Sequence, residues 1–154
     1  MYQCSIHLHS CVCAKMPTEQ KMCLGFEFLK QIAGVLVAAA KAAVPIKFTA
    51  GLHHPIRQHR DEVKTKMHGF LNVLGAAVLT AEHGWDWAQV SAMLEDEDPG
   101  SFTFSDDFFA WREWKIDVSR LKERRRYVTT FGSCSFDEPR EDLRVLKLLY
   151  PVSG

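Results

Sequence analysis

The side chains best suited to chemistry are concentrated between residues 47 and 60. Lys47 could bind a carboxylate or phosphate, or act as an amine nucleophile if it were desolvated. His53 and His54 could transfer protons or bind a metal. Arg57, together with Arg60, could hold an anion through paired hydrogen bonds. We therefore take Lys47, His53 and His54 as candidate catalytic residues, and Arg57 as a candidate substrate-binding residue.

An expected strand places these residues at one edge of a sheet. Apolar and polar residues alternate over residues 44–51, which predicts a strand with Lys47 and Thr49 on its polar face. The polar segment 52–66 is expected to be a loop leaving the carboxyl end of that strand, where α/β folds bind their ligands. Thr49 is therefore a second candidate for substrate binding. The alternative is a lysine at a sheet edge and a polar loop that carries histidines without function.

A turn of small residues provides a second candidate site. Ser133, Cys134 and Ser135 follow an expected strand at residues 128–131 and precede a helix expected to begin after Asp137. A helix N-terminus lowers the pKa of a nearby thiol and offers N–H groups to an anion. We expect these three residues to bind substrate on the same face as the His53 loop. The alternative is a buried, inert cysteine in a tight turn.

A third candidate is the pair His7 and His9, because alternate residues of a strand point to the same side. The two imidazoles could share a divalent metal, and a metal-dependent hydrolase could combine them with His53 or His54. The five cysteines contain no C-x-x-C pair, which argues against a zinc knuckle.

The elements that must position these residues are mostly helical. Apolar residues recur at three- and four-residue steps and predict helices over 26–43, 66–83, 118–127 and after Asp137, with another from Trp87 behind an Asp86 cap. Residues 102–104 and 108–116 are expected to form a hairpin, and 14–21 a loop. The expected fold class is α/β, with α+β as the alternative: a single domain over 24–154, built as an open sheet packed with helices or a partial barrel, after a separate Cys- and His-containing segment 1–23.

Three stretches together carry a family resemblance: KFTAGLHHPIR (47–57), MHGFLNVL (67–74) and FGSCSFDEPREDLRVLKLL (131–149). They resemble the C-terminal half of a mainly bacterial family of uncharacterised proteins that look like relatives of α/β barrels. The resemblance covers about residues 28–149 and implies a barrel-like α/β fold without a named activity. A chain that holds only part of a barrel would expose sheet edges, so we also expect a homo-oligomer to be possible.

Composition excludes several classes of protein. Lys+Arg and Asp+Glu both number 19, and a formal net charge of zero does not indicate a nucleic-acid partner. No apolar stretch reaches the length of about 20 residues that a membrane-spanning helix requires. With no recognisable signal peptide we expect a cytoplasmic protein with reduced cysteines.

Three interpretations of function remain open at this point. The first is an enzyme-like domain that binds a small anionic or carbonyl substrate at residues 47–60. The second is the metal-dependent hydrolase with its divalent metal as cofactor. The third is a non-catalytic truncated paralogue or an oligomeric interaction protein.

Overall fold

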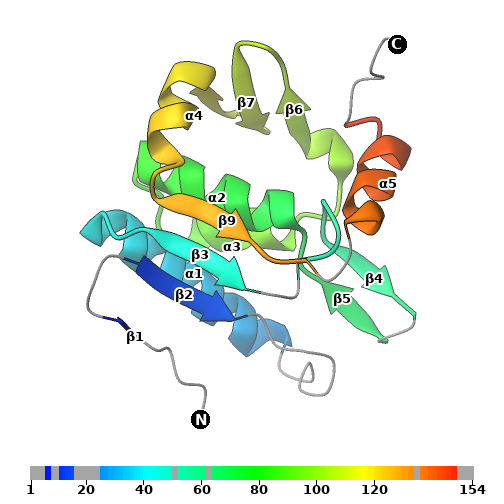
Figure 1. Ribbon diagram of the computed structural model, residues 1–154, viewed down its shortest axis with the longest axis horizontal. Helices are drawn as coiled ribbons and strands as arrows, with labels where there is room; N and C mark the ends of the chain where they lie inside the picture. The colour runs from blue at the N-terminus through cyan, green and yellow to red at the C-terminus, as the bar shows by residue number, and fades with distance from the viewer. Residues whose placement is uncertain are drawn as a thin grey trace.

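The structure is a computed structural model that describes residues 6–7, 11–15, 25–49, 52–61, 64–133 and 136–148. It combines helices with three small sheets, the coarse class expected from the sequence (Figure 1). The main sheet has the strand order β1-β2-β3-β9. Its strands are β1 (Ile6–His7), β2 (Cys11–Lys15), β3 (Ile46–Thr49) and β9 (Val128–Phe131). β2, β3 and β9 run parallel, so their carboxyl ends meet at one edge.

β2 and β3 are joined by α1 (Gly25–Ala42), which confirms the helix expected over 26–43 to within one residue at each end. The apolar stripe of α1 includes Leu29, Ile32 and Leu36, all buried. Ala43 adopts a positive φ of 52° directly after the helix, and Pro45 then prevents any return to it. α1 lies behind the main sheet in Figure 1 and packs against the two following helices.

The central helix is α2 (Phe70–His83), most of whose side chains are buried. It ends at Gly84, whose φ of 67° is the left-handed conformation that glycine adopts without strain. α3 (Trp87–Glu95) begins with the expected capping box. The Asp86 side chain accepts hydrogen bonds from the N–H groups of Ala88 and Gln89, and the Gln89 side chain accepts one from the N–H of Asp86. α2 starts four residues later than expected because residues 65–67 form a strand instead.

Two smaller sheets flank this core. The hairpin of β4 (Gln58–Arg60) and β5 (Thr65–Met67) lies mostly in the segment 52–66 that was expected to be a loop, and its last residues lie where a helix was expected to begin. Both expectations are wrong over these residues. The turn η2 (Pro99–Ser101) leads into a meander of β6 (Phe102–Phe104), β7 (Phe108–Trp111) and β8 (Trp114–Asp117), where a single hairpin was expected.

Two short helices complete the described chain. α4 (Val118–Arg124) is shorter than the helix expected over 118–127 and turns directly into β9. α5 (Asp137–Val145) begins one residue before the expected start and lies beyond the carboxyl end of β9. β2 places part of the N-terminal segment in the main sheet, whereas residues 14–21 were expected to be a loop.

Within the described ranges, no helix has the length and apolar character needed to cross a membrane.

Candidate functional site

The loop after β3 is fixed against the N-terminus of α2. The carbonyl oxygens of His54 and Pro55 accept hydrogen bonds of 2.8 Å from the N–H groups of Phe70 and Leu71. Gly69, the residue before the helix, provides no side-chain cap, so these loop carbonyls satisfy donors that the first turn of a helix leaves open. The buried side chains of Leu52 and Ile56 anchor the same loop in the core. The two histidines of the loop are therefore held in place by backbone contacts.

His54 is buried, with 1 % of its surface exposed, and it faces two carboxylates of α5. Its Nδ1 lies 2.6 Å from Oδ2 of Asp142. Its Nε2 lies 3.8 Å from Oε1 of Glu138. Residues 138 and 142 are one helical turn apart, so both carboxylates point to the same side of α5. The His54 ring is thereby fixed in orientation and joins α5 to the loop.

His53 is more accessible and meets a third segment of the chain. Its Nδ1 lies 3.5 Å from Oε2 of Glu138 and 3.4 Å from Oγ of Ser133, and its side chain is 18 % exposed. Both partners lie at the same ring nitrogen, so Ser133, the carboxylate and the ring do not form a nucleophilic triad, which needs the hydroxyl at the other nitrogen. Arg60 lies beside the same carboxylate, with Nη2 3.7 Å from Oε1 of Glu138.

We call this group the His53 cluster. Its members come from the loop after β3, the hairpin strand β4, the turn after β9 and the first turns of α5: His53, His54, Arg60, Ser133, Glu138 and Asp142. Ser133 of the turn after β9 contacts His53, so this residue meets the His53 loop as expected. Cys134 and Ser135 lie outside the residues that the structure describes.

The structure separates Lys47 from this cluster. Ile46 and Phe48 on either side of it are buried, so Lys47 is exposed on the opposite face of β3. In the described part of the chain its ammonium makes no hydrogen bond or ion pair with a cluster residue. Thr49 is the last residue of β3 and precedes the loop.

Arg57 also points elsewhere. Its Nη1 lies 3.2 Å from Nδ1 of His68, and its Nε lies 3.7 Å from Oε1 of Glu97. Burial, reinforced by the positive charge of Arg57, lowers the pKa of His68 to about 3, so the neutral ring can accept a hydrogen bond from the guanidinium. Burial also lowers the pKa of Arg57. Arg57 therefore belongs to a buried polar network, in which its backbone N–H also donates to Asn72.

Of the two candidate metal ligands near the N-terminus, His7 lies on β1, which pairs with β2. His9 lies outside the described residues. Among the side chains that the structure describes, no group of three or more His, Cys, Asp or Glu is arranged to hold a metal ion.

Sequence reasoning did not identify Glu138 and Asp142. A signal was present, because the segment Asp-Glu-Pro-Arg-Glu-Asp at 137–142 places two carboxylates four residues apart at the start of an expected helix. The sequence could not provide the direction of that helix relative to the histidine loop.

No protein-family model, no curated protein and no solved structure matches this chain. A function for the chain therefore has to be inferred from the geometry of the site and its chemistry.

Proposed function

We propose that this chain is an enzyme-like domain that binds a small carbonyl or anionic compound at the His53 cluster and transfers a proton through His53. The observation that supports this most is the convergence of two imidazoles and two carboxylates at the edge where parallel strands β3 and β9 end. That edge is where open α/β sheets bind ligands.

His53 is the proposed proton donor and acceptor because of how its ring is placed. Glu138 lies at Nδ1, which leaves Nε2 for a ligand. A carboxylate on one ring nitrogen orients the ring while the other nitrogen exchanges a proton. His54, buried between Asp142 and Glu138, positions α5 and does not meet the ligand in this proposal. Lys47 has no catalytic role here, because it is exposed on the other face of β3.

The charges of the cluster narrow the substrate class. Two carboxylates lie within hydrogen-bonding or ion-pairing distance of the imidazoles, and Arg60 is close to one of them. A multiply charged anion would be repelled more strongly by these carboxylates than a carbonyl compound with at most one negative charge. A 2-oxo acid or an aldehyde therefore fits the cluster better than a phosphate ester.

We also propose a relationship to α/β barrels. The β2–α1–β3 unit and the parallel pairing of β3 with β9 are arrangements that such folds contain, and they support the resemblance carried by residues 47–57 and 131–149.

The experiment is a titration of protein labelled with ¹⁵N at its seven histidines, observed by NMR at the ring nitrogens. Pyruvate serves as the carbonyl probe, with acetate and inorganic phosphate for comparison. We expect saturable shifts of the His53 ring signals with pyruvate and weaker shifts with phosphate. His53→Gln should abolish pyruvate binding, whereas the control His59→Gln should retain it, because His59 is 54 % exposed on a hairpin and contacts Asp61.

Glu138→Gln tests the orienting role of the carboxylate. The folded variant should retain ¹⁵N signals for both rings but show a changed Nδ1 environment at His53 and weaker pyruvate binding, because the ring loses the carboxylate that orients it. If no carbonyl probe shifts the His53 signals of the folded wild-type protein, the proposed function is wrong.

A further inference from the structure

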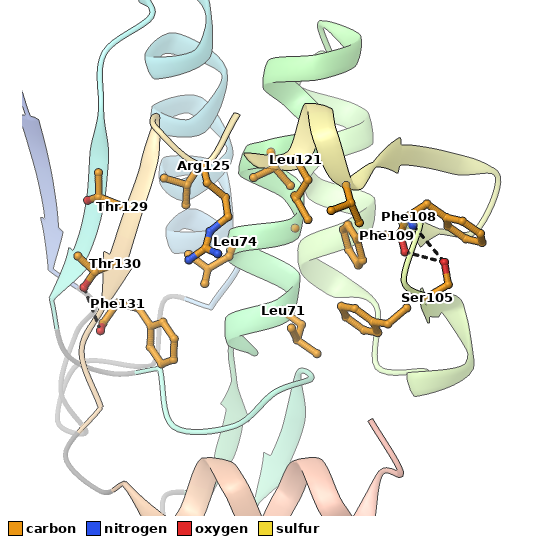
Figure 2. Close-up of a pocket in the computed structure, with 15 residues that line it drawn as sticks. Leu71, Leu74, Ser105, Phe108, Phe109, Leu121, Arg125, Thr129, Thr130 and Phe131 are labelled. Carbon is orange, nitrogen blue, oxygen red and sulfur yellow. Dashed lines mark hydrogen bonds between the residues drawn. The ribbon is translucent and has the colours of Figure 1, made fainter. Parts of the chain in front are cut away.

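A separate apolar pocket lies between α2, the β6–β7 hairpin, α4 and β9 (Figure 2). Its volume is about 430 Å³, within the usual range for sites that bind small organic molecules. Leucine, valine and phenylalanine provide most of the wall, with Leu71, Leu74 and Val78 from α2 and Phe109 and Phe131 from the two sheets. None of the described lining residues belongs to the His53 cluster, so a ligand of this pocket is independent of the proposed function.

The hydroxyl groups of the wall are already used as donors. Ser105 Oγ donates to the carbonyl of Phe108, Thr129 Oγ1 to that of Ile46, and Thr130 Oγ1 to that of Phe131. Each hydroxyl has one O–H, so none of these three has a donor left for an anionic ligand. Polar recognition in this pocket therefore falls to Arg125, the one charged residue among the described residues of its wall.

Arg125 differs from the two arginines of α4 that precede it. Arg120 and Arg124 both donate to Glu82 of α2, at distances from 2.7 to 3.1 Å, and so fix α4 on the central helix. Arg125 follows at the end of α4, and no described carboxylate lies within 4 Å of its guanidinium. Figure 2 shows that guanidinium beside Leu74, inside the ring of lining residues, with Phe131 and Leu71 further along the pocket.

We propose that this pocket binds an amphiphilic monocarboxylate: Arg125 binds the carboxylate, and the apolar chain extends past Leu74 toward Leu71 and Phe131. A guanidinium with no anionic partner among the described residues, next to an apolar cavity, favours one negative headgroup on an apolar body. At about 30 Å³ per heavy atom, the liquid volume of a water molecule, the pocket holds on the order of 14 heavy atoms. A saturated acid of medium chain length fits that limit.

The test is isothermal titration calorimetry of the full chain with decanoate, below the concentration at which it forms micelles. Decanol and acetate are the comparison probes. Decanol has the apolar chain but no carboxylate, and acetate has the carboxylate but no long chain. We expect decanoate to bind saturably, and decanol and acetate to bind about tenfold more weakly or not at all, because the charged hydrogen bond or the buried chain is missing.

Arg125→Met isolates the charge, and Arg126→Met is its matched control on the neighbouring exposed residue, which is not part of the pocket wall. Arg125→Met should lower the affinity for decanoate by about tenfold and leave the affinity for decanol unchanged. Arg126→Met should bind decanoate with the affinity of the wild type. Methyl signals of Leu71, Leu74 and Leu121 should shift with decanoate in the wild type, which locates the chain independently of any variant.

Three results would overturn the proposal: no decanoate binding by the folded wild-type chain, equal losses in both arginine variants, or methyl shifts confined to residues outside the pocket. Decyl phosphate tests the headgroup. Tighter binding of decyl phosphate than of decanoate would replace the carboxylate assignment with a phosphate one.

Discussion

At the scale of single residues, Gly69 shows how closely the histidine loop is packed on α2. A β-carbon there would collide with the carbonyl oxygen of Pro55, the carbonyl carbon of Ile56 and the side-chain oxygen of Asn72. Two of these three atoms belong to the backbone and cannot rotate away. We expect Gly69→Ala to lower the free energy of unfolding by about 3 kcal/mol, at the upper end of overpacking costs. Urea denaturation measures this change.

Gly34 provides the control for that substitution. It lies within α1, is exposed, and a β-carbon added to it would meet no atom within 4 Å. Gly34→Ala should therefore raise the free energy of unfolding by about 0.5–1 kcal/mol, since alanine favours a helix interior over glycine. A Gly69→Ala variant as stable as the wild type would show that the loop is not held by these contacts.

Single residues also show what sequence reasoning can reach in the candidate site. The contact between Ser133 and His53 could be predicted, because ligand sites form where parallel strands end and both residues follow such strands. The side chains of Lys47 and Arg57 do not join that site, because their directions depend on burial: Lys47 lies on the exposed face of β3, and Arg57 is drawn toward His68 and Glu97. No local pattern encodes those contacts.

At the scale of elements, two arginines of α4, Arg120 and Arg124, bind Glu82 of α2. Arg120 and Arg124 hold the pKa of Glu82 at about 2, well below its ordinary value of 4.5. The unfolded chain takes up a proton on this residue below pH 4.5, whereas the folded chain does so only near pH 2. The stabilisation is therefore present above pH 4.5 and is lost as the pH falls through that window.

Glu82→Gln should lower the free energy of unfolding by about 1–2 kcal/mol at pH 7, a value reduced for the solvent around partly exposed arginines. The loss should shrink toward zero between pH 4.5 and pH 2. Urea denaturation at about pH 7 and about pH 3 measures the loss of stability at each pH. Glu123→Gln is the control, because Glu123 contacts the same Arg120 but is half-exposed on α4 itself. An equal loss in the two variants would contradict an anchoring role for Glu82.

Helices were easier to predict than sheets in this chain for a physical reason. The stripe of α1 and the capping box of α3 are local patterns, and both elements appear where those patterns predict them. β2 was missed because its residues lack alternation and form a strand through pairing with β1 and with β3, which lies on the far side of α1 in the sequence. β4 and β5 were missed because a polar hairpin carries almost no periodic apolar signal.

At the scale of the whole molecule, one buried network joins the histidine loop to the meander. Asn72 of α2 accepts a hydrogen bond from the N–H of Arg57 and donates to the carbonyl groups of Met93 and Asp96 at the end of α3. Asp96 in turn accepts from Trp111 and Arg112 of the meander. At the end of this network nearest the histidine loop, the His68 ring contacts the guanidinium of Arg57. A change at His68 should therefore affect the stability of the whole fold.

A pH dependence with a defined sign follows from the burial of His68. Because the pKa of His68 is about 3 in the fold and about 6.5 in an unfolded chain, the unfolded state binds the extra proton between these values. Stability must then fall as the pH drops below 6.5, by up to about 1.4 kcal/mol per pH unit for one proton. Between about pH 7 and about pH 5 the wild type should lose about 2 kcal/mol from this residue.

His68→Asn should remove this loss while its side-chain oxygen still accepts from Arg57. Urea denaturation at about pH 7 and about pH 5 should show the variant slightly less stable than the wild type at the higher pH, and as stable or more stable at the lower one. His59→Gln, at an exposed histidine of the β4 strand, should keep the wild-type dependence. Parallel pH curves for wild type and His68→Asn would mean that the His68 ring accepts a proton in the fold as readily as in the unfolded chain, which would contradict the lowered pKa of His68.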